Sequence, residues 1–589
     1  MYNILFVNKI LQRYKLILFW LAVYGILFSF LQVYSKFYFY YIEQNHFFQN
    51  TWSFVFENLL EPGGLASVIS GFLIQFFLLP YAGAAITAAL LTIAGWLTYG
   101  IIGRITSPSG WLVACLLPVI ALMLIQFNPN YLPFGTIAFL LTLINLYFVL
   151  SIKDFHRRLV FHLLATFALF YTAGSVYMLY AFAVTIYEFF KGSLLSYPVL
   201  LILLEALLIG TGSVYFLTYT AYRFAFLPDH YFHYKWLPGT LIYLSWVCVL
   251  LMVTAACLIR KRKIANKNIR MYVIVQILMV AGCCWWGILM YGFGERSKII
   301  ALDYYCRTEQ WDSILELCKE PLNDYLSLGY ANMALAKKGE LGDKAFSYDQ
   351  AGIEGLIFPW DKSAFSSMFL SDVYDAMKHL ALSQKMAFEA FVITGSPRML
   401  QRLVQTNLIY GAYPVAEKYI CILENMYCYR KWAKAHRKFL YHDVAIELDA
   451  ALGSKRKSLA KANFLSRIDG LDMDLQQLAI DNPCNRTAME YAGVMYLLSK
   501  DMENFRKLLE NCQQTEIFPV LPVSFQEAIL IFSLKEPGYW THDDISEVTK
   551  LRFFEFLKDV SANKNPRVAL SVSLKPSYGD TYWYYHMFK

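Results

Sequence analysis

The sequence has few charged residues for its length. Asp, Glu, Lys and Arg make up 16% of its 589 residues, whereas hydrophobic residues make up 57% and aromatic residues 17%. Soluble globular domains usually carry about 25% charged residues. The composition therefore excludes an ordinary soluble protein of this size and favours a chain with a large membrane-embedded part.

The motifs of common soluble enzymes are also missing. The sequence contains no Gly-rich phosphate loop, no nucleophile elbow, no paired-Cys motif and no His-Glu-x-x-His, which argues against a soluble-type ATPase, hydrolase, redox enzyme or metalloprotease. Its 11 cysteines lack metal-ligand spacing, so neither a metal nor a cofactor is predicted. The net charge is +8, but the basic surplus lies in short loops of the first half. No nucleic-acid partner is therefore expected.

Long apolar runs fill the first half of the chain. A bilayer core about 30 Å thick needs about 20 apolar residues in a helix. We identify nine such runs: Leu16–Tyr34, Gly64–Pro80, Tyr81–Ile102, Trp111–Phe127, Leu132–Ser151, Leu159–Phe190, Leu194–Tyr215, Leu237–Ile259 and Met271–Phe293. The second and third meet at Pro80 without a polar turn, which leaves a re-entrant hairpin open, and the sixth is long enough to break at Gly174. Residues 1–293 are thus predicted to form an all-α polytopic membrane domain with about nine spans.

Basic residues in short loops predict which side of the membrane each loop faces. Such residues mark the cytoplasmic side, and the densest group is Arg260–Lys263 with Lys267 and Arg270. Counting spans from this loop predicts a cytoplasmic N-terminus and a C-terminal half on the outer side. Lys191 agrees with this count, but Lys153–Arg158 would lie on the outer side, against the rule.

The second half has the pattern of packed helical pairs. From Glu295 onward charged residues are frequent, and apolar residues recur every three or four positions, which indicates amphipathic helices. One stretch, Trp311–Phe346, resembles a degenerate tetratricopeptide (TPR) unit, and Leu408–Tyr419 and Glu490–Asp501 resemble parts of others. A period of 34 residues is not sustained. We predict a soluble, TPR-like helical solenoid over residues 294–564 and an aromatic, non-periodic tail over 565–589; a plain helical domain without a ligand is the alternative.

One acidic residue lies within a predicted span. Glu205 is near the middle of the run Leu194–Tyr215, where an ionised carboxylate is unfavourable unless it is paired or hydrated. It is a candidate proton- or ligand-binding residue, with His162 and Arg223 as candidate partners; a neutral glutamate that links two helices is the alternative. Glu188, by contrast, is expected to pair with Lys191.

Two predicted outer loops carry the other candidate residues. The first contains Glu43, Glu57 and Glu61 among aromatic residues. Its position resembles that of the first outer loop of membrane-embedded glycosyltransferases, in which an acidic residue acts as the base, but this loop has no Asp. A solvated acidic loop is the alternative.

The second outer loop combines cations with aromatic rings. Its candidate substrate-binding residues are Arg223, His230, His233 and Lys235, close to Asp229. Cations and rings suit a lipid-linked phosphate and sugar, although an interfacial aromatic belt has the same composition. A metal shared by the two histidines is not predicted, because a third ligand is missing.

Several segments together carry a resemblance to a known family. They are Glu61-Pro-Gly-Gly, Gln75–Ala84, Leu408–Tyr419, Tyr429–Ala433 and Asn485–Tyr491. In these segments the chain resembles an uncharacterised, domain-of-unknown-function family of Bacteroidales inner-membrane proteins. The resemblance covers nearly the whole chain. It implies the same architecture and a location in the bacterial inner membrane, and it supplies no catalytic residues.

Three functions are compatible with these features. The leading one is an integral membrane protein of the bacterial envelope whose C-terminal domain, on the periplasmic side, binds or scaffolds other proteins. The second is a glycosyltransferase-like enzyme that uses a lipid-linked donor. The third, a transporter, depends on Glu205 and a broken sixth span, but inverted repeats are not visible in the sequence.

Overall fold

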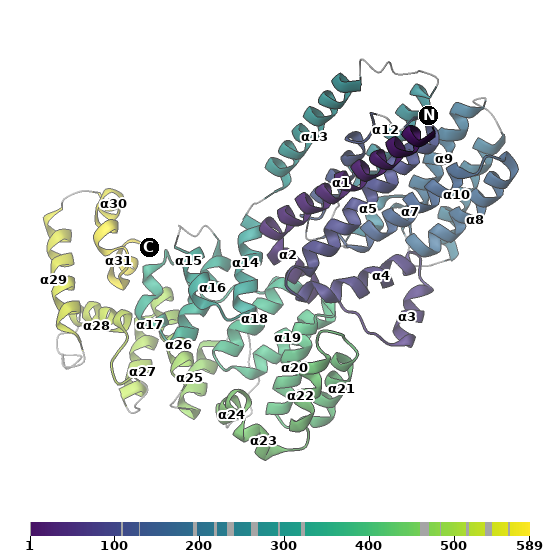
Figure 1. Ribbon diagram of the computed structural model, residues 1–589. Coiled ribbons are helices and arrows are strands. Elements are labelled where there is room, and N and C mark those ends of the chain that lie inside the picture. Colours follow the sequence, from purple (N-terminus) through teal and green to yellow (C-terminus); the bar gives the residue numbers. More distant parts are fainter. Residues whose placement is uncertain are drawn as a thin grey trace. The chain divides into compact units, whose positions relative to one another are not determined.

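The computed structural model confirms an all-helical chain (Figure 1). It describes residues 2–107, 110–128, 130–192, 197–216, 221–232, 241–260, 269–292, 295–319, 324–459, 471–482, 485–513, 518–535, 545–563 and 566–589. Two compact units make up the chain. Unit 1 comprises Met1–Ser297 with Asn425–Cys428, and unit 2 comprises Lys298–Glu424 with Tyr429–Lys589.

Unit 1 contains most of the long apolar helices. Its elements are α1 (Tyr2–Tyr34), α2 (Lys36–Gln44), α3 (Trp52–Leu59), α4 (Gly64–Ile74), η1 (Gln75–Leu78), α5 (Ala82–Ile105), η2 (Ala114–Leu116), α6 (Leu117–Ile125), α7 (Phe134–Ser151), α8 (Phe155–Ala173), α9 (Tyr177–Lys191), α10 (Tyr197–Phe216), α11 (Tyr222–Phe226), η3 (Pro228–Tyr231), α12 (Leu241–Ile259) and α13 (Ile269–Tyr291). Within the described residues, five helices are long and apolar enough to cross a membrane: those in α1, α5, α7, α10 and α13.

The sixth predicted span breaks at Gly174, the position at which a break was considered. Gly174 has φ +83° and ψ −148°, a backbone conformation that is almost restricted to glycine. The chain reverses direction at this glycine. As a result, Arg158 at the start of α8 forms an ion pair of 2.5 Å with Glu188 near the end of α9. Helices α8 and α9 therefore form an antiparallel hairpin, and the run Leu159–Phe190 is not one helix.

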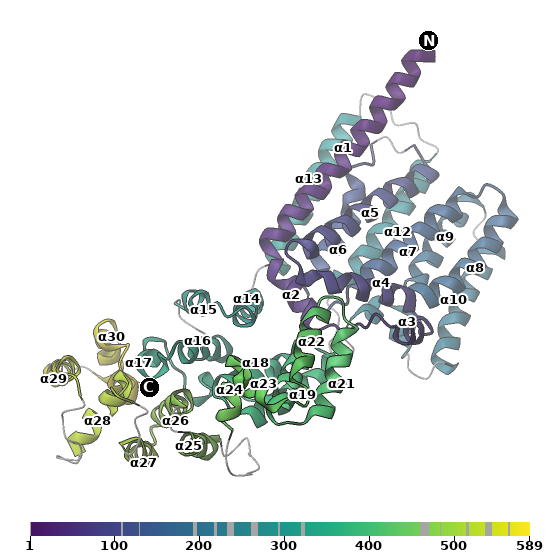
Figure 2. The ribbon, with the colours of Figure 1, turned by 60° about the horizontal axis from the view of Figure 1, so that its bottom comes forward.

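The second predicted span lies across one end of the bundle. At its start, the Gly63 N–H donates to the carbonyls of Phe170 and Tyr171 at the end of α8. At its other end, Phe77 packs edge-on against Phe39, 5.2 Å between ring centres, just before α5 begins. Figures 1 and 2 show α4 running across the long helices rather than beside them. Both ends of the segment 64–80 therefore lie at one end of the bundle, so it does not run the length of the bundle as the predicted span over Gly64–Pro80 would.

Basic residues gather at the opposite end of unit 1, which we call the basic end. The Arg104 guanidinium, at the end of α5, donates to the Tyr147 hydroxyl near the end of α7 over 2.5 Å. Arg158 donates to the carbonyls of Ile152 and Lys153. Lys191 interacts electrostatically with Arg158 and Arg260. The loops after α5, α7, α9 and α12 therefore meet at this end; residues 261–268, with most of the predicted basic cluster, lie outside the described part of the chain.

Unit 2 is a succession of shorter helices. They are α14 (Glu295–Arg307), which begins in unit 1, α15 (Trp311–Leu317), α16 (Tyr325–Lys338), α17 (Leu341–Lys344), α18 (Ala364–Ala376), α19 (Leu380–Thr394), α20 (Pro397–Ile409), α21 (Tyr413–Glu424), α22 (Arg430–His436), α23 (Asp443–Leu448), α24 (Ala450–Lys457), α25 (Leu471–Asp481), α26 (Arg486–Ser499), α27 (Met502–Gln513), α28 (Val523–Lys535), α29 (Glu547–Ala562), α30 (Arg567–Tyr578) and α31 (Tyr582–Phe588). The predicted tail, 565–589, contains the last two, and Trp583 from α31 is buried in the core of unit 2.

Small residues let neighbouring helices of unit 2 approach closely. Ser371 on α18 and Ser383 on α19 each donate a hydroxyl hydrogen bond of 2.9 Å to the other residue's carbonyl. A Cβ at Gly493 on α26 would lie only 2.1 Å from the Phe525 ring on α28. These contacts explain why serine and glycine interrupt otherwise apolar helix faces.

Candidate functional site

Glu205 lies beside His162, one of its two expected partners. The two side chains come from α10 and α8, with Glu205 Oε2 3.7 Å from His162 Nε2. The imidazole stacks on the Tyr180 ring from α9, at 5.1 Å between ring centres. The Thr166 hydroxyl lies 3.3 Å from His162 Nε2. Three helices thus enclose a carboxylate, an imidazole, a phenol and a hydroxyl.

Arg223, the other expected partner, forms an ion pair elsewhere. Its guanidinium binds the buried carboxylate of Asp229 in the same loop. The second oxygen of Asp229 accepts a hydrogen bond of 2.9 Å from the Tyr243 hydroxyl. The charge of Arg223 is therefore balanced locally, which weakens it as a receptor for an added phosphate.

Glu188 forms its salt bridge with Arg158, a partner that the sequence analysis did not name, and it also interacts electrostatically with the expected partner Lys191. Both oxygens of Glu188 accept hydrogen bonds from Arg158, at 2.5 and 3.1 Å. A planar guanidinium matches a carboxylate in this two-bond arrangement better than an ammonium group does. Sequence spacing favours pairs within one helix, and it missed this pair because the α8–α9 hairpin creates it.

The three glutamates of the first outer loop have different surroundings. Glu43, in α2, is buried at 2% exposure, whereas Glu57 and Glu61 are exposed. Glu61 stands two residues before Gly63, where a Cβ would lie 3.2 Å from His230 Nε2. Because two residues span at most about 7 Å, the backbone of Glu61 lies near the His230 ring.

The His230 ring packs between three segments of unit 1: the turn before α4, the turn between α8 and α9, and the start of α7. Its ring contacts Gly63 and Gly174 and packs edge-on against Phe134 at the start of α7. Burial lowers the pKa of His230 to about 4, with the Pro62 backbone opposing the shift, so the ring is neutral at pH 7. The other candidates in this loop, His233 and Lys235, lie outside the described residues.

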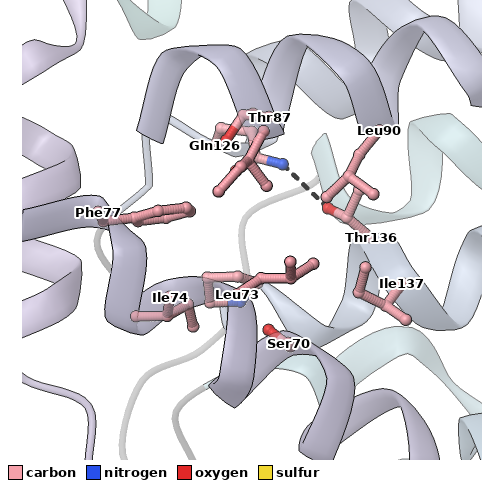
Figure 3. A pocket seen from close by; sticks show the side chains of 11 residues that line it. Ser70, Leu73, Ile74, Phe77, Thr87, Leu90, Gln126, Thr136 and Ile137 are labelled. Atoms are coloured by element: carbon pink, nitrogen blue, oxygen red, sulfur yellow. Dashed lines mark hydrogen bonds between the residues drawn. The ribbon is translucent and has the colours of Figure 1, made fainter. Parts of the chain in front are cut away.

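A small cavity lies beneath α4, at the end of unit 1 opposite the basic end (Figure 3). Its volume is about 20 Å³, which is room for about one water molecule. Apolar side chains dominate its wall, and the Gln126 amide donates to the Thr136 hydroxyl over 2.9 Å. The lining residues are Ser70, Leu73, Ile74, Phe77, Ile86, Thr87, Leu90, Gln126, Pro133, Thr136 and Ile137. The cavity is too small to hold a sugar.

Unit 2 contains a buried ionic network that the sequence analysis missed. Arg398 binds Asp303 at 2.9 Å and Asp372 at 2.5 Å. Arg402 binds Asp372 and Asp375, and Lys455 binds Asp375 at 2.6 Å. Burial disfavours the ionised form of Asp375, but the charges of Arg402 and Lys455 outweigh it and lower its pKa.

The spacing of these charges was a usable signal. The two acids on α18 are three residues apart and the two arginines on α20 are four apart, so each pair lies on one helix face. Three cations and three carboxylates balance within the network, which fits a structural role better than ligand binding.

Among the described residues, no group of three or more His, Cys, Asp or Glu side chains is placed to hold a metal ion.

Comparisons with known proteins identify a family without a known activity. Neither the curated proteins nor the solved structures yield a match. The model of a family of unknown function (DUF6057) matches residues 12–589. Since this match covers nearly the whole sequence, the chain belongs to that family.

Proposed function

We propose that this chain is an integral membrane protein of the bacterial envelope whose C-terminal unit binds and scaffolds other envelope proteins on the outer side. The observation that carries the proposal is the gathering of Arg104, Arg158, Lys191 and Arg260 at one end of unit 1. Basic loops remain in the cytoplasm. The basic end is therefore assigned to the cytoplasmic side.

This assignment removes the conflict that the sequence left. A sixth span from Leu159 to Phe190 would have put Lys153–Arg158 on the side opposite Lys191. In the α8–α9 hairpin, Arg158 and Glu188 meet, so both loops lie at the same end. The positive-inside rule now holds for each of these loops.

The corrected count again gives nine crossings. Helix α4 drops out because it lies across one end, and the hairpin adds one crossing. The proposed spans are α1, α5, α6, α7, α8, α9, α10, α12 and α13. Five of the nine contain windows long and apolar enough to cross alone, and the other four would cross as packed members of the bundle. Because nine is odd, unit 2 would lie on the side opposite the N-terminus.

Fusions of a topology reporter test the sidedness. Alkaline phosphatase is active only outside the cytoplasm, and green fluorescent protein fluoresces mainly inside it. We expect an active phosphatase at Lys589 and a fluorescent protein after Gly192. A fusion after Lys153 separates the two span counts, because the four crossings proposed before it put this loop inside, whereas a fifth crossing by Gly64–Pro80 would put it outside. Phosphatase activity at Lys153 would contradict the proposed arrangement.

The scaffolding role is supported by the close packing of neighbouring helices in unit 2, such as α18 with α19, and by exposed apolar side chains on one short helix. Tyr441, Val444 and Leu448 at α23 are 61%, 63% and 82% exposed. We expect a photo-crosslinking residue at Leu448 to capture defined envelope proteins in living cells. The same residue at Lys507, on an exposed charged helix, is the control. Identical products at both positions, or none at Leu448, would refute a specific binding surface.

A group-transfer reaction with a lipid-linked donor is the second candidate. It is favoured by the closeness of Glu61 to His230, since an exposed carboxylate there is suited to act as a base. The Arg223–Asp229 pair opposes it, because the phosphate would have to displace Asp229. Binding of a polyprenyl phosphate to the purified protein tests this candidate by native mass spectrometry. Equal binding by the native protein and an Arg223→Ala variant would exclude Arg223 as the phosphate ligand.

A further inference from the structure

A line of ionisable groups leads inward from the basic end of unit 1. Arg158 and Glu188 form the outermost pair, with side chains 2% and 8% exposed. His162 follows one helical turn further along α8, and Glu205 reaches it from α10. Charged and titratable groups are rare between packed apolar helices and usually mark a pathway for protons or ions. This line therefore requires an explanation beyond helix packing.

Several polar atoms at the inner end of the line lack partners. Among the described residues, Glu205 Oε2, His162 Nδ1 and the Tyr180 hydroxyl are buried and accept or donate no hydrogen bond. Unsatisfied buried polar atoms are unfavourable. Three such atoms, one of them an oxygen of the Glu205 carboxylate itself, indicate that the site takes up something that the protein atoms alone do not supply.

A second cavity lies between His162 and the Arg158–Glu188 pair at the basic end. Its volume is about 10 Å³, close to the minimum for a water molecule. The wall is formed by Phe155, Arg158, Leu159, His162, Val184, Glu188, Pro198 and Ile202. Water or a proton can enter a space of this size, whereas an organic substrate cannot. A bound metal ion is also disfavoured, because the described residues offer no third His, Cys, Asp or Glu ligand.

We propose that α8, α9 and α10 enclose an intramembrane proton-binding site formed by Glu205 and His162. The pair is electrically neutral when it holds one proton, either on the carboxylate or on the imidazole. Closing the present gap of 3.7 Å to hydrogen-bond length would let the two groups share this proton. Loss of the proton leaves a net negative charge, which the enclosed surroundings disfavour.

The cavity provides the route by which the proton exchanges with the cytoplasmic side. Arg158 and Glu188 border this route, and Lys191 lies beyond it. On the other side of the pair, Tyr180 faces His162. The proposal rests on the proposed insertion of unit 1 in a membrane, but it is independent of what unit 2 binds.

A hydrophobic carbodiimide tests the site, because it dissolves in the bilayer and modifies carboxyl groups only when they are protonated. Full-length protein in lipid nanodiscs is treated with dicyclohexylcarbodiimide at a series of pH values, and the modified peptides are measured by mass spectrometry. We expect labelling of Glu205 that falls at least about tenfold as pH rises through the range in which carboxyl and imidazole groups titrate. Labelling of Glu205 that is absent throughout, or independent of pH, would overturn the proposal.

Three variants make the result specific. Glu205→Gln should abolish the labelling, while Glu547→Gln, which changes an exposed glutamate of unit 2, should leave it unchanged. His162→Phe retains the carboxyl group and should move the pH midpoint by about one unit or more, since the proton can no longer be shared. An unmoved midpoint would refute the pairing. The topology fusions are read separately, so a failure of membrane insertion is distinguishable from a failure of this site.

Discussion

The two units use the same helical structure but present opposite surfaces. In unit 1, α13 exposes many large apolar side chains, including Leu278 at 68% and Trp285 at 70%. In unit 2, α16 buries ten consecutive residues from Ser327 to Ala336 and ends in two lysines. Exposed apolar surface is stable against lipid but not against water. The difference is what the proposed membrane insertion of unit 1 requires.

The units also differ in how they bury charge. Among the described residues of unit 1, both partners of the Arg158–Glu188 pair are buried, and the Glu205–His162 pair can be neutral. Unit 2 buries a network of six charges around Arg398 and Arg402. Such a network is tolerated because its charges balance and its central ions have two partners each, but the loss of one member leaves others unpaired. The first prediction concerns this network.

Replacing Arg398 should have the largest effect. Arg398→Met removes the main partner of Asp303 and one partner of Asp372, which leaves buried carboxylates poorly compensated. Removing one member of a buried pair costs about 3–5 kcal/mol. Pulse proteolysis of unit 2 in the full-length protein over a urea series measures the change. Lys507→Met, which removes an exposed pair with Glu503, should cost less than about 1 kcal/mol; equal effects would mean that the network adds nothing.

One substitution made in both units tests the contrast between their surfaces directly. Leu278 on α13 and Leu551 on α29 are similarly exposed, at 68% and 63%. Leu278→Asp should impair membrane insertion by about 2.5–3.5 kcal/mol, the cost of Asp at the centre of a span. Leu551→Asp should change stability by less than about 0.5 kcal/mol.

The measurement is the fraction of protein that resists alkaline extraction from membranes. If both variants stay embedded to the same extent as the native protein, α13 does not face lipid. If alkaline treatment extracts the Leu551→Asp variant from the membrane but not the Leu278→Asp variant, the surfaces of the two units have been assigned the wrong way round.

Two glycines with positive φ give a matched backbone test. Gly174, at φ +83° and ψ −148°, joins α8 to α9, and a Cβ there would lie 2.7 Å from His230, whereas a Cβ at Gly352, at φ +84° and ψ −169°, would lie in open space. Gly352→Ala should cost about 1–3 kcal/mol for this backbone conformation. Gly174→Ala should cost about 1 kcal/mol more, because the ring must move. The melting temperature in detergent reports both; an equal loss would show that His230 is loosely packed.

The sequence predicted the helical class and the apolar helices, because both follow from local composition. It did not predict which apolar runs extend along the whole length of unit 1 as single helices. The runs over Gly64–Pro80 and Leu159–Phe190 have similar apolarity, yet one lies across the bundle and the other folds back at Gly174. Turns at single glycines are decided by tertiary contacts, here with His230. In the proposed topology these two differences from nine simple spans offset each other in the number of crossings, and the proposed side of unit 2 is unchanged.

The candidate site was also predicted only in part. Glu205 was identified because an acid in an apolar run is visible in the sequence, and His162 was one of two possible partners. The pairing of Arg223 with Asp229 was missed, although both lie in one short loop. Arg158 and Glu188 are 30 positions apart in the sequence. Contacts of that kind depend on how helices are arranged, which periodicity does not encode.

One buried acid should make the stability of unit 2 depend on pH. Burial raises the pKa of Glu527 from 4.5 to about 8, although the Tyr582 backbone N–H and the charge of Arg552 oppose the shift and Asp580 adds to it. Between these values the folded protein keeps a proton that the unfolded chain has lost. The stability of unit 2 should therefore fall as pH rises through this window, by up to about 1.4 kcal/mol per pH unit, and level off above it.

Glu527→Gln should remove this slope, because the amide stays neutral at every pH and its oxygen can still accept the Tyr582 N–H, which lies 2.6 Å from the native carboxylate. Pulse proteolysis at pH 5, 6, 7 and 8, roughly spanning the window, compares the variant with the native protein. The variant should gain relative stability steadily across the series. Parallel curves would mean that Glu527 is ionised in the fold, and that unit 2, unlike the proton-holding pair proposed for unit 1, buries its acids only as charged partners of arginine and lysine.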